Sequence, residues 1–146
     1  MIYSRPTEYA IRAMAWIASQ RGGATRFTAK QIAEAEGLPQ PILAKTLQLL
    51  AQRGLLESRK GPGGGFRLQR DPRQISLLEV VEAVDEFDIS WRCAVGLAEC
   101  NDEVPCPLHD RWQHLRDYIL RYLRSTSLEQ MRQAVVRKKE LAVGKR

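Results

Sequence analysis

The sequence predicts a mainly α-helical protein: a winged helix-turn-helix domain with a small β-hairpin wing, plus a long C-terminal dimerisation helix. Three observations lead to this fold class. Two helical patterns meet at a short turn around Gly37, a glycine-rich segment follows at residues 60–65, and an apolar repeat of about 3.5 residues begins at Leu108. At 146 residues, the chain has room for one domain with a core and one extended element.

The first half of the domain is predicted to contain three helices, of which the second and third form a helix-turn-helix. Small and apolar residues recur at helical spacing over residues 7–19, which predicts the first helix. Thr28 and Gln31 form a capping box that should begin a second helix over residues 29–36. Gly37 suits the positive φ of a turn, so a helix-turn-helix is expected.

The third helix should begin near Pro41 and present two different faces. Its inward face carries Leu43, Leu47 and Leu50. Its outward face carries Gln40, Lys45, Gln48 and Gln52. Amide side chains can pair with adenine edges, and lysine with guanine or phosphate, so the outward face suits the major groove of DNA. An ordinary solvated helix face is the alternative.

The wing is predicted by two short alternating segments, residues 55–59 and 66–69, on either side of Lys-Gly-Pro-Gly-Gly-Gly. A glycine-rich tip lets the backbone approach a phosphate closely, and the basic residues beside it supply charge. The segment lacks the Lys-Ser/Thr of a nucleotide-binding loop and does not open a helix. We therefore interpret it as a DNA-contacting hairpin.

The candidate DNA contacts share a place on these helices or on the wing. They are Thr28, Lys30, Gln40, Pro41, Lys45, Gln48, Arg59, Lys60, Gly61, Gly63, Gly64 and Arg67. The formal net charge of +6 favours a polyanionic partner, double-stranded DNA above all, although a generally basic surface would give the same charge.

All three cysteines of the chain lie in one segment that ends at His109: Cys93, Cys100 and Cys106. No signal-peptide or membrane-spanning run is present, so we expect a cytoplasmic protein without a membrane partner. In that reducing compartment an odd, clustered set of cysteines favours metal or redox chemistry. Thiolates anchor iron-sulfur clusters, whereas structural zinc and a thiol-only switch are the alternatives. No catalytic constellation accompanies the thiols, so an enzyme is not expected.

The second half of the chain is predicted to be helical. Ser76 and Glu79 form another capping box, which should begin a fourth helix. A coiled-coil seam is expected beyond the cysteines, at Leu108, Trp112, Leu115, Ile119 and Tyr122. Such a helix needs a partner, unless it folds back on its own domain. A last helix should begin near Ser127.

The ordered motifs KGPGGGF, SLLEVVEAVDE and CAVGLAEC with PCPLHDRW resemble the Rrf-type family of winged helix-turn-helix regulators, which includes the iron-sulfur regulators IscR and NsrR. The resemblance covers about residues 1–135. It implies a homodimeric transcriptional regulator that binds a pseudo-palindromic operator. It also implies an iron-sulfur cluster, held by Cys93, Cys100 and Cys106, that senses iron, redox or nitric oxide status.

The family resemblance leaves two candidates for the fourth ligand. IscR-like members use a histidine three residues after the last cysteine, where this chain has His109, and NsrR-like members use an acidic residue of the partner subunit, where it has Glu8. We favour a 2Fe-2S cluster over 4Fe-4S. A cluster-free or zinc-bound thiol switch of the same fold is the alternative. The expected division is a DNA-binding domain (1–86), a cluster-binding loop (87–109), and a dimerisation helix with a C-terminal tail (110–146).

Overall fold

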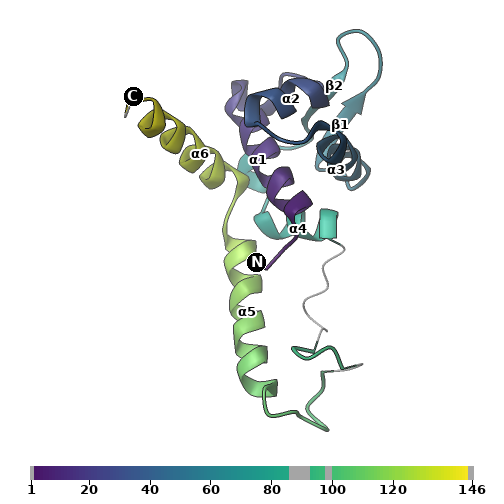
Figure 1. Cartoon of the computed structure of the whole chain (residues 1–146), viewed down its shortest axis with the longest axis vertical. Helices are drawn as coiled ribbons and strands as arrows, with labels where there is room; N and C mark the ends of the chain where they lie inside the picture. The colour runs from purple at the N-terminus through teal and green to yellow at the C-terminus, as the bar shows by residue number, and fades with distance from the viewer. Residues whose placement is uncertain (1, 86–92, 98–99, 145–146) are drawn as a thin grey trace.

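The computed structural model describes residues 2–85, 93–97 and 100–144, so the predicted boundary between residues 86 and 87 lies outside the described residues. Figure 1 shows a helical domain from which one long helix extends. The helices are α1 (Arg5–Ser19), α2 (Ala29–Glu36), α3 (Gln40–Gln52), α4 (Leu77–Asp85), α5 (His109–Ser125) and α6 (Leu128–Val143). The strands are β1 (Leu56–Arg59) and β2 (Gly65–Leu68), and the short 3-10 turns are η1 (Arg21–Gly23) and η2 (Pro72–Gln74).

The predicted helix-turn-helix is confirmed, with both of its local signals in place. The Thr28 hydroxyl accepts from the Gln31 backbone N–H at 3.2 Å, and the Gln31 side chain accepts from the Thr28 N–H at 2.9 Å. Gly37 ends α2 in the left-handed conformation, with φ of 64°. The leucines of the inward face of α3 are fully buried, and α1, α2 and α4 surround the same core.

The wing is an antiparallel pair in which Leu56 faces Leu68 and Arg59 faces Gly65. Its base is closed by Phe27, whose backbone exchanges two hydrogen bonds with Phe66, at 3.0 and 2.8 Å. Gly65 has no room for a side chain, because a Cβ there would lie 2.4 Å from the Phe27 carbonyl oxygen. The hairpin is therefore fixed to the segment that leads into α2.

The joint between α5 and α6 is fastened to the DNA-binding domain by backbone hydrogen bonds. The Leu77 N–H donates to the Thr126 carbonyl at 2.9 Å, and the Leu128 N–H donates to the Ile75 carbonyl at 2.8 Å. From this joint, α5 runs away from the domain and α6 lies against α1 (Figure 1). The N-terminal end of α5, with the cysteine segment, thus lies at the far end of a helix anchored beside α4.

The predicted apolar seam of α5 is split between two faces. Ile119 is 9% exposed and packs into the core of its own chain, as does Leu123 at 1%. Leu115 and Tyr122 are instead both 51% exposed. The reason is that the C-terminal half of α5 packs against α4, which turns residues 119 and 123 toward the domain. In the described part of the chain, no helix combines the length and apolar character needed to cross a membrane.

Candidate metal centre and nucleic-acid interface

Helix α3 and the wing lie on the same side of the domain (Figure 1). The candidate side chains of α3, namely Gln40, Pro41, Lys45 and Gln48, are all exposed, as are Thr28 and Lys30 at the start of α2. An open groove of about 500 Å³ separates α3 from β2, and Lys45, Gln48 and Phe66 are among the residues that line it. The arrangement offers amides and a cation at a groove beside a glycine-rich hairpin.

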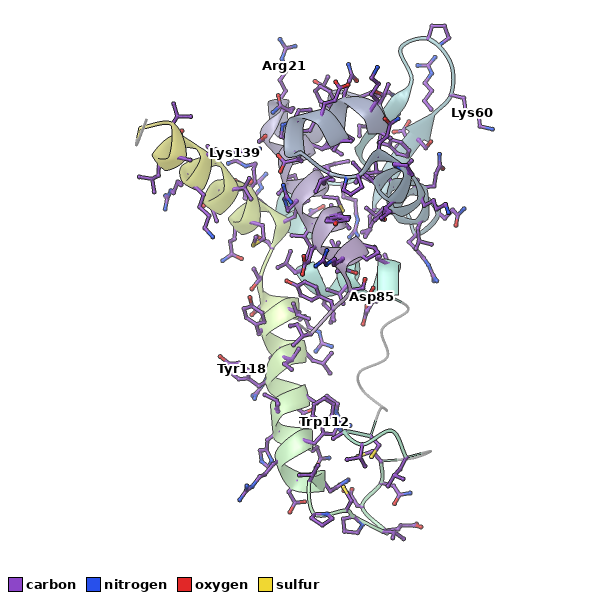
Figure 2. All side chains as sticks on the ribbon, viewed as in Figure 1. Arg21, Lys60, Asp85, Trp112, Tyr118 and Lys139 are labelled. Carbon is purple, nitrogen blue, oxygen red and sulfur yellow. The ribbon has the colours of Figure 1, made fainter. Side chains whose placement is uncertain are left out.

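The wing presents its charge at the tip. Arg59, Lys60, Gly61 and Gly63 are exposed, whereas Gly64 and Arg67 are half-buried. Lys60 projects from the hairpin away from the rest of the domain (Figure 2). Gly64 closes the tip, where a Cβ would lie 2.3 Å from the Arg59 carbonyl oxygen.

The charge of Arg67 is already paired within the protein, through contacts much shorter than the 3.9 Å between Lys30 Nζ and Glu34 Oε1. Its Nε and Nη2 atoms lie 2.7 and 2.6 Å from Glu57 Oε2 on the facing strand. Arg26 also binds the Glu57 carboxylate, and it donates to the Glu57 carbonyl at 3.3 Å. Hydrogen bonds from Arg26 and then Arg67 hold the pKa of Glu57 below its usual value. No periodic pattern in the sequence indicates this cross-strand cluster.

The cysteine segment brings the predicted metal ligands together in two pairs. Cys100 Sγ lies 3.3 Å from His109 Nδ1, and the Cys106 side chain is close enough to the Cys93 sulfur to help lower its pKa. The His109 backbone N–H donates to the Cys106 carbonyl at 2.9 Å, which links the pairs. His109 is only 6% exposed, and the three cysteines are half-buried. Among the described residues, no three such side chains are close enough to hold a single ion.

The environment of Cys93 favours the metal-binding form of its sulfur. Backbone N–H groups of Val95 and then Leu97 hydrogen-bond the sulfur and hold its pKa below the ordinary value, with smaller contributions from Gly96 and Cys106. Because the thiolate is both the nucleophile and the metal ligand, Cys93 is prepared for either metal binding or redox chemistry.

Asp102 is a member of this site that the sequence did not single out. Its Oδ1 atom lies 2.8 Å from His109 Nε2, on the side of the ring opposite to Cys100. The distance in sequence between Asp102 and His109 does not correspond to any known motif, so it could not predict this contact. The one available signal was its position between two candidate ligands.

Glu8 lies elsewhere in the chain, half-buried in the first turn of α1 beside Tyr3 and Tyr9. Burial raises the pKa of Tyr3, and the charges of Tyr122 and Glu8 raise it further, so this group is next to the C-terminal half of α5. The cysteines are at the opposite end of α5, which has 17 residues and is therefore about 25 Å long. Within one chain, the structure does not bring Glu8 to the cysteines.

A helix-turn-helix with a basic wing, joined through one long helix to a cysteine segment, defines a winged helix-turn-helix transcriptional regulator. Residues 3–134 match the Rrf2 family, described as "Iron-dependent Transcriptional regulator", and the chain belongs to this family. The expected resemblance is thus confirmed. As a member of a family of transcriptional regulators, the protein is a DNA-binding regulator and not an enzyme.

Individual relatives agree with the family assignment. The chain is 36% identical over 125 residues to the HTH-type transcriptional regulator IscR of Photorhabdus laumondii, covering 84% of this chain and 74% of that relative. The solved structure of T. potens IscR has a TM-score of 0.69 at 25% identity and covers 90% of this chain and 86% of that one. CymR, titled the global cysteine regulator of B. subtilis, has a TM-score of 0.73 at 22% identity, over 90% and 95% of the two chains, and shares the fold.

Proposed function

We propose that the protein is a homodimeric iron-sulfur regulator that reports iron, redox or nitric oxide status to an operator. Cys93, Cys100 and Cys106 would hold the cluster, with His109 as the fourth ligand. The observation that carries this proposal is the 3.3 Å contact between Cys100 Sγ and the buried His109 Nδ1, in the segment that holds all three cysteines.

The donor set fits such a cluster in its chemistry. Thiolates are the usual ligands of iron-sulfur clusters, and histidine replaces cysteine in some 2Fe-2S centres. Each iron of a 2Fe-2S cluster takes two protein ligands, whereas each iron of a 4Fe-4S cluster takes one, so the close approach of Cys100 to His109 supports 2Fe-2S. The cluster would supply a redox- and oxygen-sensitive group, while the chain supplies the ligands and their connection to α5.

Dimerisation is proposed to use the exposed face of α5. Leu108 is 47% exposed, and Leu115, Tyr118 and Tyr122 are 51%, 64% and 51% exposed. Tyr118 points away from the domain in Figure 2, on the side of α5 opposite to Trp112. A contiguous apolar face on an extended helix indicates an interaction surface, and two-fold pairing of the same face closes a dimer.

An antiparallel pair of α5 helices would support Glu8 as an alternative fourth ligand. In such a pair, the N-terminal end of one α5 lies beside the C-terminal end of the other. Because Glu8 is next to the C-terminal half of its own α5, the cysteine segment of the second copy would come near it. The cluster would then join the two subunits.

On DNA, each subunit is proposed to place α3 in the major groove and the wing against the backbone. Two such modules related by two-fold symmetry would read half-sites one helical turn apart, about 34 Å, and hence a pseudo-palindromic operator. Gln40, Pro41, Lys45 and Gln48 would face base edges, and Thr28, Lys30, Arg59, Lys60, Gly61, Gly63, Gly64 and Arg67 would face phosphates. Because Arg67 is paired with Glu57, its contribution should be smaller than that of Arg59.

A cluster-free or zinc-bound thiol switch is the second candidate. The nearness of Cys106 to the Cys93 sulfur favours it, since an external oxidant that accepts two electrons and two protons can convert two neighbouring thiols to a disulfide without iron. The fold, the dimer and the DNA interface would be the same, so only the chemistry of the cysteine segment separates the candidates.

Anaerobic purification followed by visible absorbance and native mass spectrometry tests the proposal. The wild-type chain should be coloured and carry two irons and two sulfides. His109→Ala should lose or destabilise the cluster, whereas Glu8→Ala and the control His114→Ala, an exposed histidine of α5, should retain it. Loss in Glu8→Ala with retention in His109→Ala would assign the ligand to Glu8. A colourless wild type that holds zinc or a disulfide would favour the second candidate.

A further inference from the structure

We propose that Asp102 is a positioning residue that fixes the tautomer of His109, so that His109 Nδ1 and Cys100 Sγ bind the same iron. The proposal rests on the proposed cluster and names the nitrogen and the thiolate that share a metal.

The hydrogen-bonding capacities of Asp102 and His109 determine where the ring proton lies. A carboxylate accepts hydrogen bonds and donates none, so the 2.8 Å contact requires the proton of His109 to be on Nε2. A neutral imidazole with its proton on Nε2 has its lone pair on Nδ1. That atom is the one that faces Cys100, at 3.3 Å.

The surroundings of His109 keep the ring in this orientation. The side chain of His109 is 7% exposed, and its backbone N–H is bound to the Cys106 carbonyl at the start of α5. Asp102, by contrast, is 86% exposed, so its side chain is available for substitution without opening the core. Carboxylates that accept a hydrogen bond from the non-ligating ring nitrogen commonly hold a metal-binding histidine in this way.

The distance between the two donor atoms fits ligands of one metal. With tetrahedral geometry and metal–sulfur and metal–nitrogen bonds of about 2.3 and 2.0 Å, two such ligands lie roughly 3.5 Å apart. The observed separation of 3.3 Å is close to that value. Cys93 and Cys106 would then be the ligands of the second iron.

The tautomer can be tested in the full-length apo protein, because it does not depend on the cluster. Two-bond ¹⁵N–¹H correlation spectra should show His109 with its proton on Nε2 in the wild type. Asp102→Ala should shift His109 toward a mixture of tautomers, whereas Glu103→Ala, which removes the same charge from the neighbouring exposed residue, should leave it unchanged. Identical spectra for the wild type and Asp102→Ala would overturn the role of Asp102.

The ligand atom is tested in the cluster-loaded protein with histidine ¹⁵N-labelled at one ring position. Pulsed EPR of the reduced cluster should show strong coupling to Nδ1. In competition with a chelator at equilibrium, Asp102→Ala should hold its iron about 10–100-fold more weakly than the wild type, and Glu103→Ala with the wild-type affinity. Strong coupling to Nε2 in the wild type would contradict the assignment. A wild type that takes up no cluster would overturn the proposed function and the shared iron, while the apo spectra would still decide whether Asp102 sets the tautomer.

Discussion

Glu36 and Lys139 form an ion pair although 103 positions separate them in the sequence. Glu36 is the last residue of α2, and its side chain is 2% exposed. Arg12 of α1 binds the same carboxylate, with Nη2 3.5 Å from Oε2, so a buried negative charge is held between two cations. Lys139 thereby joins the C-terminal half of α6 to the turn of the helix-turn-helix (Figure 2).

Replacing Lys139 with alanine should destabilise the fold by about 1 kcal/mol, because among the described residues Glu36 would keep Arg12 alone as a charged partner. The effect should be smaller than for a fully buried pair, since the Lys139 side chain is 50% exposed. Urea unfolding measures it, with Lys138→Ala as the control of equal charge. Equal stability of the two variants would show that the pair contributes nothing.

The cluster of Arg26, Glu57 and Arg67 should make wing stability depend on acid pH. The pKa of Glu57 is lowered in the folded state, first by Arg26, so its stabilising contribution is complete above the unfolded pKa of about 4.3 and is lost as the pH falls through the folded value. A carboxyl NMR titration should give a higher Glu57 pKa in Arg26→Ala. Arg59→Ala should not change it, and a shift of the same size there would point to general charge effects.

Substitutions in the wing and in α3 should weaken DNA binding in different ways. Arg59→Ala or Lys60→Ala should weaken binding to all sequences and reduce the slope of log affinity against log salt by about 1. Gln48→Ala should instead lose about 1–3 kcal/mol of discrimination at particular bases. Fluorescence anisotropy over a salt series with matched and mismatched operators separates the two. Uniform loss from all three changes would contradict this division.

Tyr118→Asp should dissociate the dimer, because it places a charge in the exposed apolar face of α5. Leu141→Asp is the matched control, as Leu141 is 66% exposed on α6, outside that face. Sedimentation velocity gives the oligomeric state of each variant. A monomeric wild type would refute the dimer, and a dimer that tolerates Tyr118→Asp and not Leu141→Asp would place the interface elsewhere.

Local signals in the sequence were sufficient for most of the fold. The capping boxes at Thr28, Ser76 and Ser127 predicted the starts of three helices, because each depends on residues three positions apart. The glycines of the wing predicted the hairpin tip, because the backbone conformation of a tight turn is also a local property. The faces of α5 could not be predicted, since Ile119 is turned inward by α4, a contact distant in sequence.

In the candidate site, too, local signals were predictive and contacts that depend on side-chain direction were not. The clustering of the cysteines with His109 limited the candidate ligands to one segment, and the structure brings Cys100 and His109 of that segment into contact. The contact of Asp102 with His109 and the neutralisation of Arg67 by Glu57 were not, because both depend on side-chain direction across a loop or a hairpin. Arg67 was predicted to contact DNA because it is a basic residue of the wing. In the structure its guanidinium is paired with Glu57, so part of its charge is neutralised within the protein.

We propose that the state of the cysteine segment changes DNA binding through α5, whose C-terminal end is fastened to the start of α4. The direct measurement is the affinity of one preparation for its operator with the cluster intact and after its removal, under anaerobic conditions and at one salt concentration. A coupling of about 1–3 kcal/mol is expected, which is roughly a 5–150-fold difference in affinity. Equal affinities of the two forms for every operator tested would contradict the account.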